Sequence, residues 1–228
     1  MEKKTELTIL MPCLNESANI GYAIRAAKRF LKDYHVNGEI LVVDNMSKDN
    51  SVKIARKSGA RVIREKMPGY GIALRHGIRS AKGKYIIMGD CDSTYDFYNL
   101  MPFLRRLRQG VPLVMGNRFA GGIKKGAMPF LHQYVGVPFL SWLGRARYKV
   151  DVYDFHCGLR GFNAKIAKEM KFTTTGMEFA TEIIANFAKR GYKISQVPTT
   201  LSVSKKPRKP HIKAIRDGFR HVKYMMTN

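Results

Sequence analysis

Cysteine is scarce in this sequence, and the spacing of the few that occur excludes two common structural uses. There are three, Cys13, Cys91 and Cys157, which lie far apart and form no CxxC pair. An odd number with this spacing disfavours a disulfide framework or a cysteine-based zinc site, and it is typical of a protein from a reducing cytosol.

Long hydrophobic runs are also missing. The charged residues 1–6 lead into an apolar run that ends at Asn15, so we expect no signal peptide. The longest uncharged stretch, residues 126–144, is interrupted by Pro129 and Pro138. A membrane-spanning helix needs about 20 mostly apolar residues. We therefore expect that the chain does not cross a membrane by itself.

Acidic residues are few compared with basic ones. The chain of 228 residues carries 17 Asp and Glu against 41 Lys and Arg, which gives a net charge of +24. Such an imbalance implies an anionic partner, and charge alone leaves open nucleic acid, anionic lipid headgroups or phosphorylated substrates. Hydrophobic residues make up 45%, which supports a sizeable core and argues against disorder.

Strand-like and helix-like segments alternate through the first half of the chain, which predicts an α/β fold with a mostly parallel sheet flanked by helices. Strands are expected at residues 7–11, 39–44, 60–64, 84–88, 112–116 and 192–197. Helices are expected at residues 20–31, 71–81, 97–108 and 176–190. Because no linker or repeat interrupts the pattern, we expect one domain that covers residues 1–228.

Polar clusters follow three of the expected strands. Asn15 and Glu16 follow the first, Asp44 and Asn45 end the second, and Asp90-Cys91-Asp92 follows the fourth. In parallel sheets, ligands bind at the carboxyl ends of the strands. Two carboxylates two residues apart can converge on Mg²⁺ or Mn²⁺, which prefer oxygen ligands and keep positions open for substrate phosphates. The acid pair therefore predicts a metal site for a diphosphate leaving group.

Two neighbouring motifs allow a structural and a functional interpretation. Asp44 and Asn45 are expected to face a base or ribose, while Ser47 or Asp49 caps the next helix. The loop that ends at Gly71 can bring backbone N–H groups to a phosphate, or it can be a plain turn between a strand and a helix.

Six short motifs occur in the order seen in family 2 glycosyltransferases, and the chain most resembles the polyprenyl-phosphate branch, which includes dolichyl-phosphate mannose synthases. The motifs are Pro12-Cys-Leu-Asn-Glu16, Val43-Asp-Asn-Met-Ser47, Gly69-Tyr-Gly71, Asp90-Cys-Asp92, Gly116-Asn-Arg118 and Asp154-Phe-His-Cys-Gly-Leu-Arg160. The resemblance implies a GT-A (Rossmann-like) fold, a nucleotide-sugar donor and an inverting transfer. It also implies a nucleotide-sugar-binding half at residues 1–120 and an acceptor-binding, membrane-facing half at residues 121–228.

The resemblance also implies the roles of individual residues. Asp154 and Asp92 are the expected catalytic residues, with Asp154 beside the transferred sugar, and Asp90 and Asp92 are the expected metal ligands. Acceptor phosphate contacts are expected from Arg160, Arg208 and Lys209. Donor contacts are expected from Pro12, Leu14, Glu16, Asp44, Asn45, Gly71, Asp90, Cys91, Asp92 and Arg118.

The chain departs from the common family pattern at several of these positions. Leu14 replaces an aromatic residue, Asn45 a second Asp, and Thr94 a Gln that helps to hold the metal. The Ser-Lys motif that the family usually has near the end of the domain is replaced by the basic segment 205–212. The phosphate contacts of that motif are therefore assigned to Arg208 and Lys209.

Three further ionisable residues leave alternatives open. His156 is either structural or catalytic. Glu178 and Glu182 lie one helical turn apart, where they could serve acid–base chemistry or pair with Arg or Lys.

Two segments could contact a membrane surface. Residues 212–226 combine an apolar stripe, which includes Phe219, Val222 and Met226, with basic flanks, and this predicts an amphipathic basic C-terminal helix. Residues 128–143 are rich in aromatics. Each segment either packs on the core or lies at the headgroup region.

Together these features predict a metal-dependent hexosyltransferase. We expect it to transfer a sugar, with UDP-glucose as the suggested donor, to a polyprenyl phosphate at the cytoplasmic membrane face. Its expected partners are an anionic membrane surface and either a membrane protein or a second copy. Alternatives are a saccharide, diacylglycerol or cell-wall acceptor, or a basic nucleic-acid-binding protein. We expect no nucleic acid partner, because no recognition motif accompanies the charge.

Overall fold

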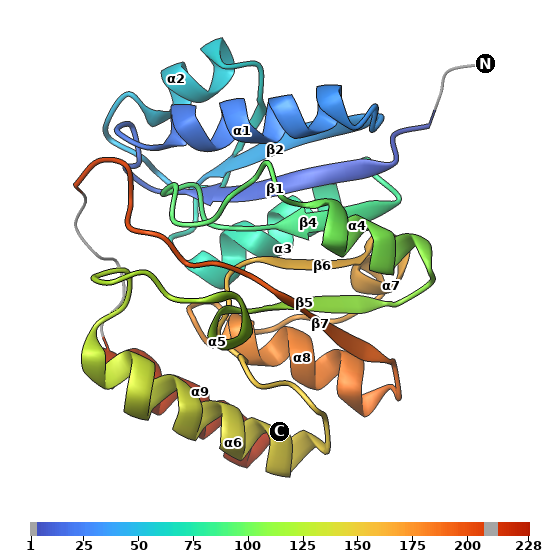
Figure 1. Ribbon diagram of the computed structural model, residues 1–228, viewed down its shortest axis with the longest axis vertical. Coiled ribbons are helices and arrows are strands. Elements are labelled where there is room, and N and C mark those ends of the chain that lie inside the picture. The colour runs from blue at the N-terminus through green and yellow to red at the C-terminus, as the bar shows by residue number, and fades with distance from the viewer. Residues whose placement is uncertain (1–3, 208–213) are drawn as a thin grey trace.

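A computed structural model describes residues 4–207 and 214–228 (Figure 1). The strands are β1 (Leu7–Cys13), β2 (Gly38–Asp44), β3 (Arg61–Arg64), β4 (Tyr85–Met88), β5 (Leu113–Asn117), β6 (Arg160–Asn163) and β7 (Ile194–Pro198). The helices are α1 (Ile20–Asp33), α2 (Ser51–Lys57), α3 (Tyr70–Ser80), α4 (Met101–Arg108), α5 (Arg118–Gly121), the π-helix η1 (His132–Gly136), α6 (Val137–Tyr148), α7 (Ala164–Lys168), α8 (Phe179–Lys189) and α9 (Ala214–Thr227).

The strands form one sheet in the order β3-β2-β1-β4-β6-β5-β7. The pairings β1–β2, β1–β4, β2–β3 and β5–β7 are parallel, whereas β6 runs antiparallel to both β4 and β5. The expected mostly parallel α/β sheet is therefore confirmed. The sequence did not predict β6, because its four residues, Arg-Gly-Phe-Asn, have neither a hydrophobic run nor an alternating pattern.

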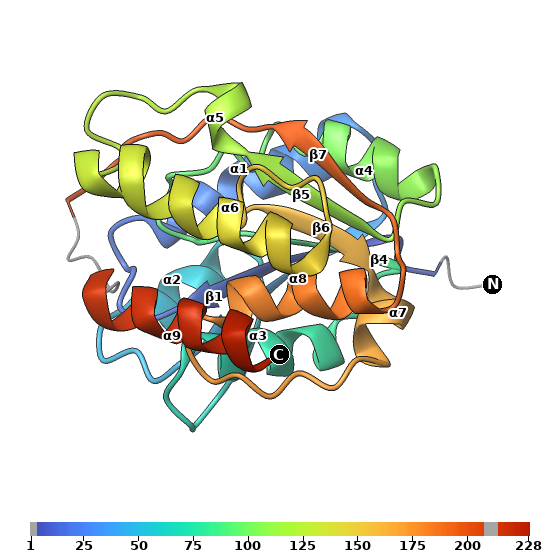
Figure 2. The ribbon, with the colours of Figure 1, turned by 90° about the horizontal axis from the view of Figure 1, so that it is seen from below.

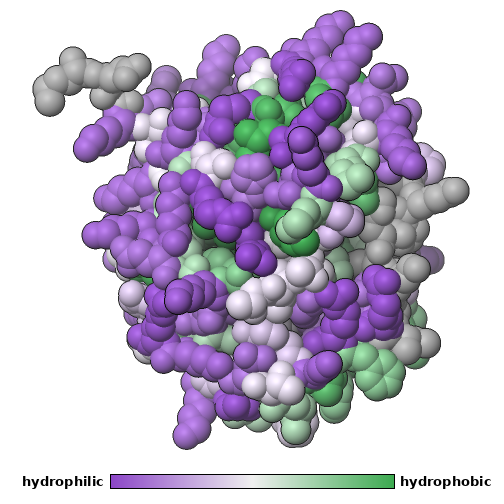
Figure 3. All heavy atoms as spheres, turned by 180° about the vertical axis from the view of Figure 1, so that it is seen from behind, coloured by the Kyte–Doolittle hydropathy of each residue, from purple (hydrophilic) through white to green (hydrophobic). Residues whose placement is uncertain are grey.

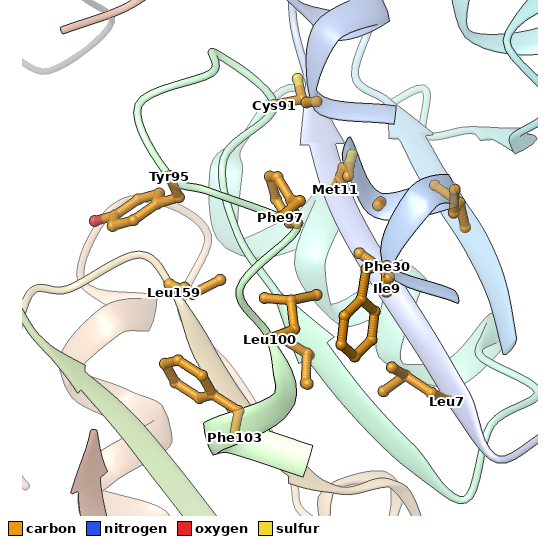
Figure 4. Packing of buried hydrophobic residues seen from close by; sticks show 14 of the residues in the cluster. Leu7, Ile9, Met11, Phe30, Cys91, Tyr95, Phe97, Leu100, Phe103 and Leu159 are labelled. Atoms are coloured by element: carbon orange, nitrogen blue, oxygen red, sulfur yellow. The ribbon is translucent and has the colours of Figure 1, made fainter. Parts of the chain in front are cut away.

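Alternate residues of β1 enter two separate cores, as the two-residue period of a strand requires. Leu7, Ile9 and Met11 face a cluster with α1 and α4, while Leu10 faces a cluster with α3 and α8. Figure 4 shows the first cluster, in which Phe30 lies near Leu7 and Ile9, while Leu100 lies between this group and Phe103. Because both faces of the sheet are covered, the central strands β1 and β4 are largely apolar.

Three helices form a layer of their own at one end of the molecule. Helices α6, α8 and α9 contact one another, and Figure 2 shows them side by side beneath the sheet. The aromatic segment expected to pack or to lie at a membrane contributes η1 and α6, and much of it is exposed. Phe130 is 72% exposed and Trp142 is 56% exposed. Figure 3 shows the opposite side of the molecule, which is mostly hydrophilic with apolar side chains scattered over it.

The C-terminal helix α9 packs on the core through a face other than its apolar stripe. Asp217, His221 and Met225 are buried, whereas Phe219 and Met226, which belong to the predicted apolar stripe, are exposed. The stripe therefore does not pack on the core. Polar residues fill the buried face because α8 and the loop before β6 supply hydrogen-bond partners there, as described below.

Candidate active site

A cavity of about 680 Å³ lies at the carboxyl ends of β1, β2 and β4. Its walls come from the loops after these strands, from residues 175–177 and from α9. The structure thus brings together the polar clusters that follow the three strands. The residues that were expected to contact the donor and that line this cavity are Pro12, Leu14, Glu16, Asn45, Asp90, Cys91 and Asp92.

The acid pair lines this cavity, and hydroxyl groups hold both carboxylates. Tyr70 donates its hydroxyl to Oδ1 of Asp90 at 3.0 Å. The backbone N–H and the hydroxyl of Thr94 donate to Oδ1 of Asp92 at 2.9 Å and 2.6 Å. Burial, followed by the charge of Asp90, raises the pKa of Tyr70 well above its usual value. Tyr70 therefore keeps its proton at neutral pH and remains a donor.

Gly158 lets the loop before β6 approach the acid pair closely. A Cβ at this position would lie 2.5 Å from Oδ2 of Asp90, which is inside contact distance. The Gly158 backbone N–H donates to the Tyr95 hydroxyl at 2.8 Å. The motif from Asp154 to Arg160 therefore touches the acid pair through its glycine.

Two of the residues that were expected to contact the nucleotide sugar, Asn45 and Asp44, make hydrogen bonds within the protein. The Asn45 side chain accepts from the Gly69 N–H at 2.8 Å and donates to the Met67 carbonyl at 2.7 Å, so it fixes the loop before α3 at the cavity wall. Asp44 is buried, and its Oδ1 accepts from the Ser47 N–H at 3.2 Å.

The structure also shows what Asp49 and the loop that ends at Gly71 do. Asp49 accepts the Ser51 N–H at the start of α2, which is the capping role expected for it. Gly71 donates its N–H to the Thr175 carbonyl at 3.0 Å, and a Cβ there would lie 2.7 Å from the Thr174 carbonyl oxygen. The Gly71 N–H is therefore used in packing against residues 174–176 rather than directed at a phosphate.

Arg118 and Asp154 bind each other rather than the cavity. Nε and Nη2 of Arg118 donate to the two Asp154 oxygens, each at 2.7 Å, and the Arg118 backbone N–H donates at 3.0 Å. Both residues are buried, and neither lines the cavity. Burial lowers the pKa of Arg118, but Tyr95 and the Asp154 carboxylate raise this pKa by more, so the guanidinium keeps its charge. The geometry is that of an internal ion pair, in place of the expected contacts with donor phosphates and sugar.

Arg160 is also an internal group. It is 1% exposed, and its three guanidinium nitrogens donate to the backbone carbonyls of Cys157, Ala180 and Phe155. The expected contact with an acceptor phosphate is not made by this arrangement, because the guanidinium is directed at the main chain. Arg208 and Lys209 lie outside the described residues.

The residues that the sequence left undecided have structural partners. Glu182 accepts from the backbone N–H and hydroxyl groups of Thr173 and Thr174. Glu178 pairs with Arg220 at 2.5 Å. His156 lies 3.2 Å from the His221 ring nitrogen, which also contacts the Thr181 hydroxyl at 2.8 Å.

The cavity residues that were not among the expected site residues include Tyr70, Met177, Arg216 and Arg220. The four-residue spacing of the two arginines predicts one helix face, and this signal could have drawn attention to them. Nothing local identifies Tyr70 or Met177 as cavity residues.

The acid pair fits a divalent cation that is shared with a substrate. Two carboxylates at one cavity wall are typical of sites where phosphate oxygens complete the shell of Mg²⁺ or Mn²⁺. Within residues 4–207 and 214–228, no cluster of three or more acidic, His or Cys side chains is placed to hold a metal alone. The donor set therefore fits a cation bound together with a diphosphate.

A mostly parallel sheet flanked by helices, with an acid pair in a cavity at the end of a central strand, is the architecture of GT-A glycosyltransferases. Residues 8–171 match the glycosyl transferase family 2, and the chain belongs to this family.

Curated relatives come from Haloferax volcanii. The chain is 37% identical over 225 residues to the low-salt glycan biosynthesis hexosyltransferase Agl6, covering 97% of this chain and 53% of that protein. It thus spans about half the length of Agl6. It is 30% identical over 194 residues to a dolichyl-phosphate hexose transferase, covering 85% of this chain and 81% of the relative.

Solved structures of the same fold include glucosyl-3-phosphoglycerate synthase from Mycobacterium tuberculosis. Its complex with uridine diphosphate has a TM-score of 0.77 at 21% identity, covering 98% of this chain and 79% of that one. A complex of that enzyme with Mn²⁺, UDP and its product has a TM-score of 0.75 at 22% identity, covering 97% of this chain and 78% of that one. In the part of the chain that the structure describes, no helix is both long and apolar enough to span a membrane.

Proposed function

We propose that this glycosyltransferase transfers a hexose, with inversion, from a nucleotide sugar to a polyprenyl phosphate. The observation that carries the proposal is the acid pair Asp90 and Asp92 in a cavity at the strand ends. The acceptor class is supported by the 30% identical relative, which is called a dolichyl-phosphate hexose transferase. UDP-glucose is the proposed donor, and this choice rests on subgroup resemblance.

Mg²⁺ or Mn²⁺ is the proposed cofactor, held by Asp90 and Asp92. When bound, it would neutralise the negative charge that develops on the leaving diphosphate. The chain itself prepares the two carboxylates. Tyr70 and Thr94 orient them through hydrogen bonds, which lowers the cost of arranging the site for the transition state.

The proposed acceptor removes the need for a general base. A lipid phosphate is already ionised at neutral pH, so its oxygen can attack the anomeric carbon without transferring a proton to the protein. This agrees with the Asp154 carboxylate being held by three hydrogen bonds from Arg118 instead of facing the cavity. Asp154 accordingly acts by fixing the loop that carries Gly158.

We also propose that the protein associates peripherally with the inner face of the cell membrane. Large apolar side chains on and before α6 are more than half exposed, and they include Phe130, Leu131, Tyr134, Phe139 and Trp142. Aromatic residues with a polar edge favour the headgroup region. We name this set the α6 apolar surface. It would place the cavity close to a lipid-borne acceptor.

A transfer screen tests the proposed function. Purified protein is incubated with radiolabelled UDP-glucose, other nucleotide sugars, undecaprenyl phosphate and Mn²⁺, and labelled lipid is extracted. We expect transfer to the lipid phosphate, and Asp92→Asn should abolish it because the acid pair is broken. Asp96→Asn is the matched control, since this exposed carboxylate of the same loop does not line the cavity.

Each other outcome of the screen has a definite meaning. Transfer to a saccharide or diacylglycerol but not to the lipid phosphate would replace the proposed acceptor. Wild-type turnover by Asp92→Asn would remove the metal role. Binding of duplex DNA in place of any nucleotide sugar would favour a nucleic-acid-binding protein and contradict the proposal.

A further inference from the structure

Helix α9 forms the wall of the cavity that the sequence did not anticipate. Arg216, Asp217 and Arg220 line the cavity, and the two arginines lie four residues apart on one side of the helix. The remaining walls carry the carboxylates Glu16, Asp90 and Asp92. An anionic acceptor that approaches these acidic walls needs cations beside its path, and in the described part of α9 these two arginines supply them.

Arg220 is anchored in place, while most of its donors remain for a ligand. Its Nη2 donates to Glu178 at 2.5 Å and to the Thr175 hydroxyl at 3.2 Å. A Cβ on Gly176 would lie 2.8 Å from the guanidinium, so the glycine leaves room for the guanidinium in this position. A guanidinium has five N–H donors, and Nη2 accounts for only two of them. The planar group is therefore oriented by the protein and can still bind a phosphate.

Arg216 is held less tightly and is more open to solvent. Its side chain is 60% exposed and contacts Asp217 at 3.3 Å, near the upper limit for a hydrogen bond. The pair of arginines thus combines one fixed guanidinium with one that can move toward an arriving phosphate. This arrangement is suited to a ligand that enters from outside.

The position of α9 distinguishes the acceptor from the donor. Helix α9 packs against α6, whose apolar surface is exposed, while the loop from Pro12 to Glu16 lies at the end of β1 on the sheet side. The arginines therefore lie on the cavity wall that is formed by α9, the helix that packs against α6. A ligand with an ionic head and an apolar tail matches this order, with its head at the arginines and its tail on α6.

We infer that Arg216 and Arg220 bind the phosphate of the acceptor. This inference rests on the proposed function, because it assumes that the acceptor is a prenyl phosphate. Neither residue was among those expected to contact the acceptor. Arg160, which was expected to do so, is buried and donates to backbone carbonyls.

The test uses the full chain with Mn²⁺, UDP-glucose and farnesyl phosphate in detergent micelles. We measure the KM for farnesyl phosphate and, separately, the Kd for UDP-glucose by calorimetry. Arg216→Gln and Arg220→Gln should each raise the KM for farnesyl phosphate by about 10-fold to 100-fold, the effect of one charge-assisted hydrogen bond. The Kd for UDP-glucose should change less than about twofold. Lys223→Gln is the matched control, because this exposed residue of α9 does not line the cavity.

The outcomes separate the inference from the proposed function. If the wild-type protein transfers glucose to no prenyl phosphate, the proposed function is wrong. If it does so and both variants keep the wild-type KM, the inference is wrong. A weakened Kd for UDP-glucose with an unchanged acceptor KM would assign the arginines to the donor and also overturn it. Arg220→Gln also removes the ion pair with Glu178 that holds α9, so a change in this variant can reflect loss of structure. Arg216 is exposed, and the KM of Arg216→Gln therefore decides the test.

Discussion

The hydroxyl of Tyr70 is the most informative single group in the site. It donates to Asp90 at 3.0 Å from the first residue of α3, so one short loop sets both the helix start and the orientation of a proposed metal ligand. The Thr94 hydroxyl likewise donates to Asp92, and it comes from the same loop as the acid pair.

We predict that Tyr70→Phe lowers the rate of transfer about 10-fold to 100-fold and raises the Mn²⁺ concentration needed for half-maximal rate. The reason is that Asp90 loses the hydrogen bond from the Tyr70 hydroxyl while the aromatic packing is retained. Tyr98→Phe is the control, since it removes a Tyr–Asp hydrogen bond at an exposed position. Equal Mn²⁺ dependence of the wild type and Tyr70→Phe would contradict the positioning role.

We predict that Asp154→Asn lowers the free energy of unfolding by about 3–5 kcal/mol, because it leaves the buried Arg118 charge without its partner. Urea unfolding followed by circular dichroism measures this loss. A combined Arg118→Met and Asp154→Leu variant should be more stable than Asp154→Asn, since it removes both charges. A stable but inactive Asp154→Asn protein would instead support the direct role beside the sugar that the family resemblance implies.

At the scale of elements, α9 shows how a polar face becomes the buried one. His221 lies against His156 and Thr181, and the rings of the two histidines meet edge to face with centroids 4.3 Å apart. Burial lowers the pKa of His221 to about 4, and it lowers the pKa of His156 well below its usual value. Both rings are therefore neutral at pH 7, and their packing attaches α9 to the loop that leads into β6.

This histidine pair predicts a loss of stability in mild acid. The unfolded chain binds a proton at His221 below about pH 6.5, whereas the folded chain does not until about pH 4, so the unfolded state gains as the pH falls through this window. Between pH 7 and pH 5 the free energy of unfolding should fall by about 2 kcal/mol from His221 alone.

Urea unfolding at a series of pH values measures this dependence. His221→Gln should flatten it, and His35→Gln, which changes an exposed ring, should leave it unchanged. A wild-type stability that stays constant from pH 7 to pH 5 would show that the two rings are not buried as neutral groups.

On the scale of the whole molecule, charge and apolar surface are distributed unevenly. The chain carries a net charge of +24, while the exposed apolar side chains gather on the face formed by η1 and α6. Positive charge attracts a protein to an anionic leaflet, and aromatic side chains then enter the headgroup region. Binding to a membrane should therefore depend on both features.

We predict that the protein sediments with vesicles that contain anionic lipid and far less with zwitterionic vesicles. Raising the salt concentration to about 0.5 M should weaken binding, because it screens the charge attraction. The double variant Phe139→Ser and Trp142→Ser should weaken binding about 10-fold or more by removing two apolar contacts. Tyr22→Ser, which changes an exposed aromatic residue of α1, is the control, and equal weakening by it would argue against the α6 apolar surface.

Much of the fold could be predicted from short-range patterns. The first four strands were expected within a few residues of their observed bounds, since each contains a short apolar run. The acid pair was placed at the end of β4 for the same reason. The antiparallel strand β6 was missed, because Arg160 makes it look like a surface segment until the carbonyls of Cys157 and Ala180 are brought around its guanidinium.

The sequence by itself determined the alternation of strands and helices, the acid pair at a strand end and the excess of positive charge. All three follow from neighbouring residues or from composition. Only the tertiary structure decided that Arg118 is bound to Asp154, that Arg160 is internal and that Arg216 and Arg220 reach the cavity. These outcomes depend on which buried charges and carbonyls meet across the fold. Partners of this kind lie tens of residues apart, so no local pattern records them.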